Sequence, residues 1–162
     1  MVAANPFAMT YQITGLDPAA FTHLAGLSDV ELATYDAVRM AVDKAPGFPC
    51  RVTLDDAPPG ETVLLVNHCS HDVGPYRATH AIFVTEGAQE VVCYADAIPP
   101  ALDRRIVSLR GFGRDGMMRD AALAHPGEAD AAVRAMLDDS AIDHIDAHNA
   151  IRGCFAARIE RD

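Results

Sequence analysis

The sequence predicts a single α+β domain built around a mainly antiparallel sheet of about seven or eight strands, with two principal helices. Two observations lead to this class. Short apolar segments bounded by turn residues recur along the chain, as strands do. Most links between these segments are too short for the crossover that parallel strands require, so neighbouring strands should be antiparallel. Because no linker, repeat or low-complexity segment divides the chain, we expect one domain over residues 1–162.

The first elements are a strand and a helix. Residues 9–14 alternate apolar and polar side chains, as a half-buried strand does. Ser28 followed by Glu31 matches a capping box, which predicts the start of a helix. The apolar positions that follow extend this helix to about Lys44, where Pro46 stops it.

Three strands are predicted in the middle of the chain. The continuous apolar run 63–67 is typical of a strand covered on both faces. Residues 78–85 and 90–95 form two more, and the turn residues at 86–88 predict that these two pair as a hairpin.

A second hairpin and a second helix follow. Residues 106–112 and 117–123 form the hairpin, and the G-x-G-x-x-G pattern over 111–116 belongs to its turn, because a strand-like segment rather than a long helix follows it. The helix starts near Pro126 and ends near Asp139, with apolar residues at helical spacing.

The C-terminal stretch 142–159 concentrates chemically capable side chains on two short strands joined by a turn at Arg152-Gly153. Side chains alternate between the faces of a strand, so His144, Asp146 and His148 share one face. Two of them, with a residue from another strand, could bind a metal ion. The favoured alternative is the solvated face of an edge strand, whose charges discourage aggregation.

A second polar cluster occupies residues 67–72. His68 and His71 could share a metal ion with Asp72 or His80, but the spacing matches no standard zinc motif. A polar loop with solvated histidines is the favoured interpretation. We therefore assign no residue as a metal ligand and keep a His/Asp metal site as a secondary alternative.

Cys154 is a candidate nucleophile, with His148 or His68 as the base. The alternative is a buried structural cysteine, which the apolar residues 155–157 favour.

Several arginines could select an anion. Tyr76, Arg77 and His80 lie just before or on a strand, and Arg110 and Arg152 lie at strand ends. Arginines that converge on a pocket would bind a carboxylate or phosphate. Structural ion pairs with the many acidic residues are the alternative, and we favour it.

Composition limits the partners. The net charge is −10 and Lys44 is the only lysine, so we expect no nucleic-acid partner. No apolar run approaches the length of a membrane span, and the start of the chain has no secretory signal pattern, so we expect a cytoplasmic protein without a membrane partner. None of the four cysteines lies in a C-x-x-C pair, and we expect reduced thiols.

An ordered set of short motifs resembles a known family over nearly the whole chain. The motifs are Phe48-Pro49-Cys50-Arg51, Pro59-Gly60-Glu61 with Val63-Leu64-Leu65 and Asn67-His68, Gly74-Pro75-Tyr76-Arg77 with Ile82-Phe83-Val84, Leu109-Arg110-Gly111-Phe112, and His148-Asn149-Ala150 with Arg152-Gly153-Cys154. The chain thereby resembles the bacterial family known as domain of unknown function 1203 (DUF1203). The resemblance implies a small, cytosolic, single-domain bacterial protein and implies neither an activity nor a cofactor.

The resemblance also selects among the candidate residues, because some fall inside the familiar motifs and others outside. It weakens the metal site on residues 144–148. It favours a site for a small anionic ligand, enzymatic or sensory, lined by His68, Tyr76, Arg77, His148 and Asn149, with Arg110 as a further ligand-binding residue.

In this hypothesis His148 is the acid or base, with His68 as a further catalytic candidate. Arg77 holds the anionic group, and Cys154 is a nucleophile if exposed. The alternative is a structural or interaction protein, a homodimer without catalytic activity, in which these polar residues only lock turns and strands together.

Overall fold

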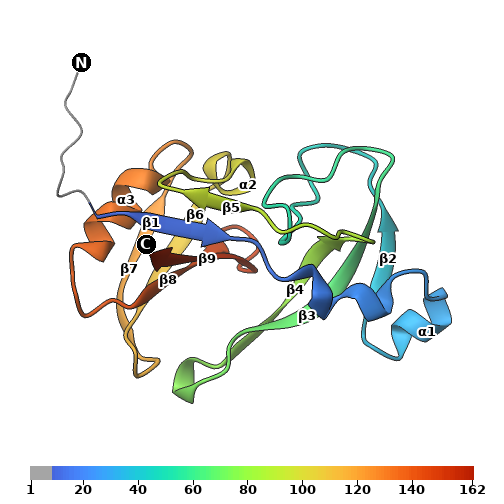
Figure 1. The fold of residues 1–162 in the computed structure, drawn as a ribbon, viewed down its shortest axis with the longest axis horizontal. Helices are drawn as coiled ribbons and strands as arrows, with labels where there is room; N and C mark the ends of the chain where they lie inside the picture. Colours follow the sequence, from blue (N-terminus) through green and yellow to red (C-terminus); the bar gives the residue numbers. More distant parts are fainter. Residues whose placement is uncertain (1–8) are drawn as a thin grey trace.

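The strands form two antiparallel sheets that lie side by side along the long axis of the molecule (Figure 1). This computed structural model describes residues 9–162. One sheet has six strands in the order β5-β1-β9-β8-β6-β7, and the other has three in the order β2-β3-β4. Every pair of neighbouring strands is antiparallel, which confirms the predicted α+β class.

The strands of the six-stranded sheet come from both ends of the chain. They are β1 (Tyr11–Thr14), β5 (Cys93–Ala95), β6 (Val107–Phe112), β7 (Met118–Ala124), β8 (His144–Asn149) and β9 (Phe155–Arg161). The hairpins predicted for β6–β7 and for β8–β9 are both present.

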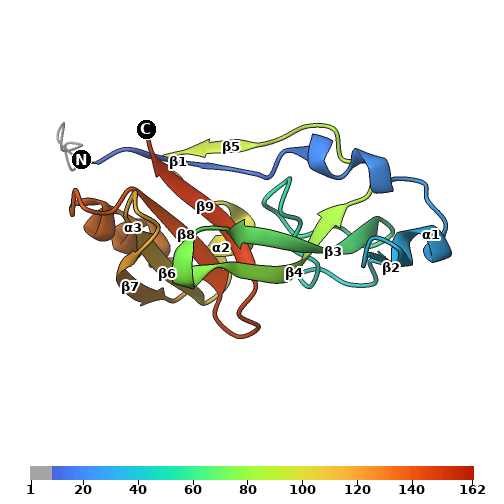
Figure 2. The ribbon, with the colours of Figure 1, turned by 90° about the horizontal axis from the view of Figure 1, so that it is seen from below.

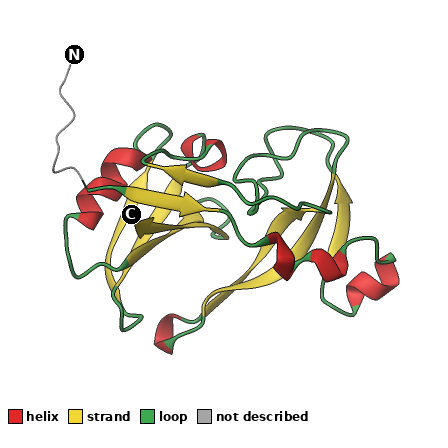
Figure 3. Ribbon diagram, in the orientation of Figure 1, coloured by secondary structure: helices red, strands yellow, loops and turns green. Residues whose placement is uncertain are grey.

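The three-stranded sheet uses the middle of the chain and extends away from the larger sheet (Figure 2). Its strands are β2 (Val38–Ala41), β3 (Thr62–His71) and β4 (Ala78–Thr85). The helical segments are short and lie around the two sheets (Figure 3). They are α1 (Asp29–Ala33), α2 (Pro100–Asp103) and α3 (Ala129–Leu137), with single 3-10 turns at Pro18–Ala20, Thr22–Leu24 and Gly74–Tyr76.

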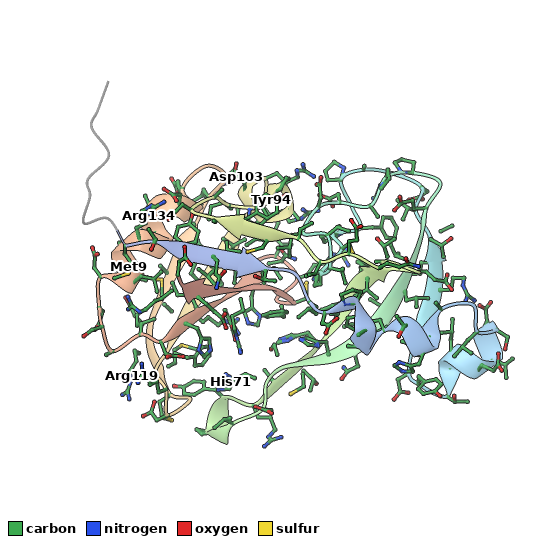
Figure 4. The ribbon with its side chains drawn as sticks, viewed as in Figure 1. Met9, His71, Tyr94, Asp103, Arg119 and Arg134 are labelled. Atoms are coloured by element: carbon green, nitrogen blue, oxygen red, sulfur yellow. The ribbon has the colours of Figure 1, made fainter. Side chains whose placement is uncertain are left out.

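One face of the six-stranded sheet is apolar and carries the larger core. Ile145 and Leu109 are fully buried there, against the apolar side of α3 that the helical spacing predicted. Arg134 of α3 also lies over the ring of Tyr11 at 5.0 Å and donates to the Met9 carbonyl (Figure 4). These contacts fix α3 on the sheet and leave the opposite face free for polar residues.

A second core lies on the three-stranded sheet and reaches into the larger one. Leu64 and Val66 of β3 and Ile82 and Val84 of β4 are buried on a common face. Phe155, the first residue of β9, belongs to the same cluster. The two sheets are therefore packed together at the point where β9 begins.

The long N-terminal helix predicted from Ser28 to Lys44 is wrong. The capping box of Ser28 and Glu31 is formed, but α1 ends at Ala33. Asp36 then adopts a positive φ of 54°, which a continuing helix cannot contain, and β2 follows at once by pairing with β3. Sheet pairing has overridden the helical pattern of this segment.

The hairpin predicted between residues 78–85 and 90–95 is also wrong. β4 pairs with β3, and β5 pairs with β1 in the other sheet. The turn after β4 instead binds the segment around α1 and β2. Glu86 accepts two hydrogen bonds from Arg39 at 2.9 and 2.7 Å and one from the Gly26 N–H. The connection therefore crosses between sheets. Among residues 9–162, every helix is too short or too polar to cross a bilayer.

We predict that Gly15→Ala lowers the free energy of unfolding by about 2 kcal/mol or more. A Cβ atom at this position would lie 2.0 Å from the backbone oxygen of Val52. The backbone cannot easily move apart, because the Leu16 N–H donates to the Arg51 carbonyl at 2.8 Å. Urea denaturation measures the change.

Gly47→Ala is the matched control. A Cβ atom there would meet only the flexible Lys44 side chain, at 3.2 Å and beyond. Equal losses in the two variants would contradict the close approach inferred at Gly15.

Candidate functional site

The polar face of the six-stranded sheet carries the chemically capable residues. His144, Asp146 and His148 alternate along β8 and therefore share this face, as predicted. Directly paired residues of neighbouring strands point the same way, so the partners of these three residues lie on the same face. The prediction that they line an edge strand is wrong, since β8 lies between β6 and β9. Their partners across β6 and β9 are Phe112, Arg110, Ser108, Glu160, Arg158 and Phe155.

Three histidines converge where the end of the β3–β4 ribbon meets this face. His68 and His80 are directly paired across β3 and β4. The His80 ring lies 4.9 Å from the His148 ring, and His68 lies 5.5 Å from the ring of Phe155. We call His68, His80 and His148 the histidine cluster. The polar loop predicted for this region is wrong, because residues 67–71 belong to β3.

The histidine cluster is uncharged near neutral pH. His148 is only 2% exposed, and burial together with the Arg110 charge lowers its pKa to about 4. Burial also lowers the pKa of His68 and of His80. The Nδ1–H of His148 donates to the Gly153 carbonyl at 3.2 Å, because a carbonyl can only accept. The lone pair of neutral His148 is therefore on Nε2.

Arg110 lies in the middle of β6, not at a strand end as predicted. Its described hydrogen bond is a long one, from Nε to the Ser108 hydroxyl at 3.5 Å. Ser108, its hydrogen-bond partner, is directly paired with His148 across β6 and β8, and the Arg110 charge helps to lower the pKa of His80 and His148. Within residues 9–162, no carboxylate forms an ion pair with Arg110.

Arg51 is a buried charge, also without an ion pair in the described chain. It is 2% exposed and donates to the carbonyls of Pro49 and Phe155. A third bond runs from Arg51 Nη2 to Cys154 Sγ at 3.1 Å. Arg51 was given no role in the predicted site. Its only signal in the sequence is its place in the motif Phe48-Pro49-Cys50-Arg51, which does not indicate that it lies under β9.

Cys154 precedes β9 in the turn and is half-buried, whereas the sequence favoured burial in a strand. Its sulfur accepts from Arg51 and from the Asn149 amide, the latter at 3.5 Å. The amide oxygen of Asn149 is buried and has no partner among the described residues. Asn149 and Cys154 are thus joined to each other and to His148 through one turn.

Asp146 separates this region from a second group of rings. Its carboxylate, 1% exposed, accepts from Arg158 Nε at 2.8 Å and from Nη2 at 3.1 Å. Arg158 also donates to the Ser70 carbonyl of β3 at 2.8 Å. The guanidinium that pairs with Asp146 inside the six-stranded sheet therefore also holds the three-stranded sheet through a hydrogen bond.

The second group, which we call the ring cluster, consists of His71, Tyr76, Phe112 and His144. His71 stacks on Phe112 at 4.3 Å, and His144 lies 5.7 Å from the same ring. Tyr76 packs edge-on against Phe112 at 5.8 Å. Figure 4 shows His71 at the end of β3, beside the β6–β7 hairpin, whose Gly116 carbonyl accepts from its Nε2.

The structure therefore divides the five residues favoured from the sequence. His68 and His148 belong to the histidine cluster, and Asn149 is the next residue along β8. Tyr76 belongs to the ring cluster. Arg77 is exposed, and its side chain makes no hydrogen bond or ion pair in the described part of the chain. The bulge between Cys69 and His71 puts His68 and His71 on the same face of the smaller sheet, but they lie in different clusters, His68 beside Phe155 and His71 on Phe112.

The sequence analysis assigned no role to Arg158, Phe112 or Phe155. Their signal is the cross-strand register, which pairs them with Asp146, His144 and His148. The register follows from strand order, and strand order is not visible in local patterns.

A separate open cleft of about 590 Å³ lies over residues 113–115 and 140–143. Three arginines line it, and each already has partners. Arg114 pairs with Asp143, Arg119 pairs with Asp115, and Arg161 donates to backbone carbonyls of residues 139 and 142. Because carboxylates neutralise two of these arginines and backbone carbonyls occupy donors of the third, the cleft is a weaker anion site than the surroundings of Arg110.

Comparison with known proteins identifies a family and supplies no activity. The family model described as "Protein of unknown function (DUF1203)" matches residues 47–161, which confirms the resemblance seen in the motifs. No curated protein and no solved structure matches the chain.

We predict that Arg158→Leu lowers the free energy of unfolding by about 3–5 kcal/mol at pH 7, because Asp146 would become a buried charge without its partner. Thermal and urea unfolding measure the loss. Arg119→Leu breaks an exposed pair with Asp115 and should cost less than about 1 kcal/mol. Similar losses in both variants would show that Asp146 is not buried as described.

We predict that the protein loses stability as the pH falls from about 6.5 to about 4. Unfolded histidine titrates near 6.5, whereas folded His148 titrates near 4, so the unfolded chain binds more protons in this range. His148 contributes a loss of about 3 kcal/mol, and His68 and His80 add in the same direction.

Unfolding free energies measured across this pH range test the effect. His148→Asn places an amide near the Nδ1 position and keeps a donor for Gly153. We expect this variant to lose less unfolding free energy than the wild type in the acid limb, the part of the curve between about pH 6.5 and about 4. His125→Asn, at an exposed surface position, should leave the limb unchanged. An acid limb identical in His148→Asn and the wild type would refute the assignment.

Proposed function

This chain belongs to the DUF1203 family, and we propose that it binds a small anionic ligand, a carboxylate or a phosphate, at the histidine cluster. Arg110 is the charged group that meets the ligand. The site is lined by His148, His80 and His68. The buried guanidinium of Arg51 adds positive electrostatic potential.

The observation that carries this proposal is that Arg110 forms no ion pair with a carboxylate within residues 9–162. A half-buried guanidinium normally finds a carboxylate, and this chain has an excess of them, with a net charge of −10. Yet Asp146, which faces Arg110 across the strand pair, is held by Arg158 instead. Arg110 retains donors that its long bond to Ser108 does not use, and a bidentate anion would satisfy them.

The surroundings strengthen the attraction for an anion. Arg51 contributes a buried positive charge that no described carboxylate neutralises. The nearby imidazoles of His68 and His80 are polar groups on the β3–β4 wall, which a ligand can use for hydrogen bonds. A positive site inside an acidic protein concentrates small anions and rejects cationic ones.

The distinction between a binding protein and an enzyme rests on Cys154 in this proposal. Its half-buried sulfur accepts hydrogen bonds from Arg51 and Asn149 beside the histidine cluster, so it stays the candidate nucleophile. His148 and His68, the acid or base candidates from the sequence, line the same site.

We also propose a bacterial, cytoplasmic setting. The four cysteines are free thiols, as suits a reducing compartment. The interaction hypothesis from the sequence, a homodimer without activity, makes the opposite prediction for ligand binding. There, substitution of Arg110 alters stability or assembly and changes no affinity for an anion.

We predict that Arg110→Gln lowers the affinity for the tightest-binding anion at least about tenfold, because a hydrogen-bonded charge pair is lost. Isothermal titration calorimetry with inorganic phosphate, acetate, malonate, succinate and citrate measures the affinity at constant ionic strength. Far-ultraviolet circular dichroism confirms that the variant is folded.

Arg119→Gln is the matched control, because Arg119 lines the separate open cleft. It should leave the affinity unchanged. If Arg119→Gln abolishes binding and Arg110→Gln does not, the cleft is the anion site and this proposal is wrong. Failure of every anion to bind the wild type at millimolar concentration would also overturn it.

A further inference from the structure

We propose that His71, His144 and Asp146 bind a divalent transition-metal ion, at a site distinct from the proposed anion site. One ligand atom from each residue lies within 4.8 Å of the other two. His71 comes from β3 of the smaller sheet, and the other two come from β8 of the larger sheet. The ion would therefore bridge the two sheets at the ring cluster.

The hydrogen bonds of His144 leave a lone pair for a metal. Its Nδ1 lies 3.2 Å from an Asp143 carboxylate oxygen. The Asp143 carboxylate also pairs with Arg114 and accepts from both partners, so the proton lies on Nδ1 of His144. Nε2 then carries the lone pair, and this atom is buried without a partner among the described residues. A carboxylate on the far nitrogen is the arrangement that orients metal-binding histidines.

His71 is prepared in the same way by a backbone group. Its Nε2 lies 3.0 Å from the Gly116 carbonyl, which can only accept, so Nε2 carries the proton and Nδ1 the lone pair. The residue is 7% exposed, and its ring is stacked on Phe112. Both imidazoles are therefore held in fixed tautomers and orientations before any ion arrives.

Asp146 supplies the negative charge. Each of its oxygens receives one hydrogen bond from Arg158 and keeps a further lone pair, because a carboxylate offers about four acceptor positions. The Arg158 charge opposes a cation, and two carboxylates offset it. Glu160 faces His144 across the β8–β9 pair, and Asp143 lies behind His144.

The donor set indicates the class of ion. Two imidazoles and one carboxylate suit Zn²⁺, Co²⁺, Ni²⁺ or Fe²⁺, whereas Ca²⁺ and Mg²⁺ prefer sites made of oxygen alone. Three protein ligands leave coordination positions for water or a substrate. Asp143 also lines the open cleft, so solvent reaches to within one hydrogen bond of His144.

The test uses the untagged full-length chain, freed of metal with a chelator that is then removed. We expect it to bind one Co²⁺ per chain with a visible absorption spectrum, and one Zn²⁺ that displaces it, measured by absorption and calorimetry. His71→Ala and His144→Ala should each abolish the spectrum. Circular dichroism shows whether each variant remains folded.

Two further variants separate this site from its neighbours. His80→Ala removes a histidine of the other cluster, and Arg110→Gln removes the proposed anion contact. His80→Ala should leave Co²⁺ affinity within about twofold of the wild type, and Arg110→Gln, which removes a positive charge opposite Asp146, should not weaken it, so that failure of one proposal does not imply failure of the other. Asp143→Ala should weaken Co²⁺ binding about 10- to 100-fold through His144 while keeping the stoichiometry at one ion.

The proposal is overturned if the wild type binds Co²⁺ and Zn²⁺ no more tightly than the double variant His71→Ala/His144→Ala. It is also overturned if His80→Ala, and not His144→Ala, removes the spectrum, because the ion would then occupy the histidine cluster.

Discussion

The ion pair between Asp146 and Arg158 is the interaction on which the arrangement of the polar face depends. Asp146 is almost fully buried at the centre of the larger sheet, where an unpaired carboxylate would be costly. Arg158 compensates it with two hydrogen bonds and uses a third donor contact to hold the Ser70 carbonyl of the smaller sheet. One guanidinium thereby satisfies a buried charge and positions β3 over β8.

This pair also divides the polar face in two and gives each half its chemistry. Because Arg158 forms the ion pair with Asp146, Arg110 has no carboxylate partner on the side of the histidine cluster within the described residues. On the other side, Asp146 still has lone pairs to share with His71 and His144. An excess of positive charge and a potential cation site can thus lie close together on one face of the sheet, separated by a compensated pair.

Sequence reasoning succeeded where the physical signal is local. The alternation in residues 144–148 correctly put His144, Asp146 and His148 on one face, and the hairpin predicted over residues 106–112 and 117–123 is the β6–β7 hairpin. It failed where distant contacts compete with local preference. The Ser28 capping box formed as predicted, yet the helix was cut short because residues 38–41 pair with β3 instead.

The sequence by itself determined the class, the β6–β7 and β8–β9 hairpins and the face to which each polar side chain of β8 points, because these follow from backbone periodicity and short links. Only the tertiary structure decided which strands are neighbours. Burial of the apolar faces against α3 and around Phe155 brings β4 to β8, so His80 meets His148, whereas Tyr76 meets Phe112 instead. Burial acts between residues far apart in the chain, so no local pattern contains that information.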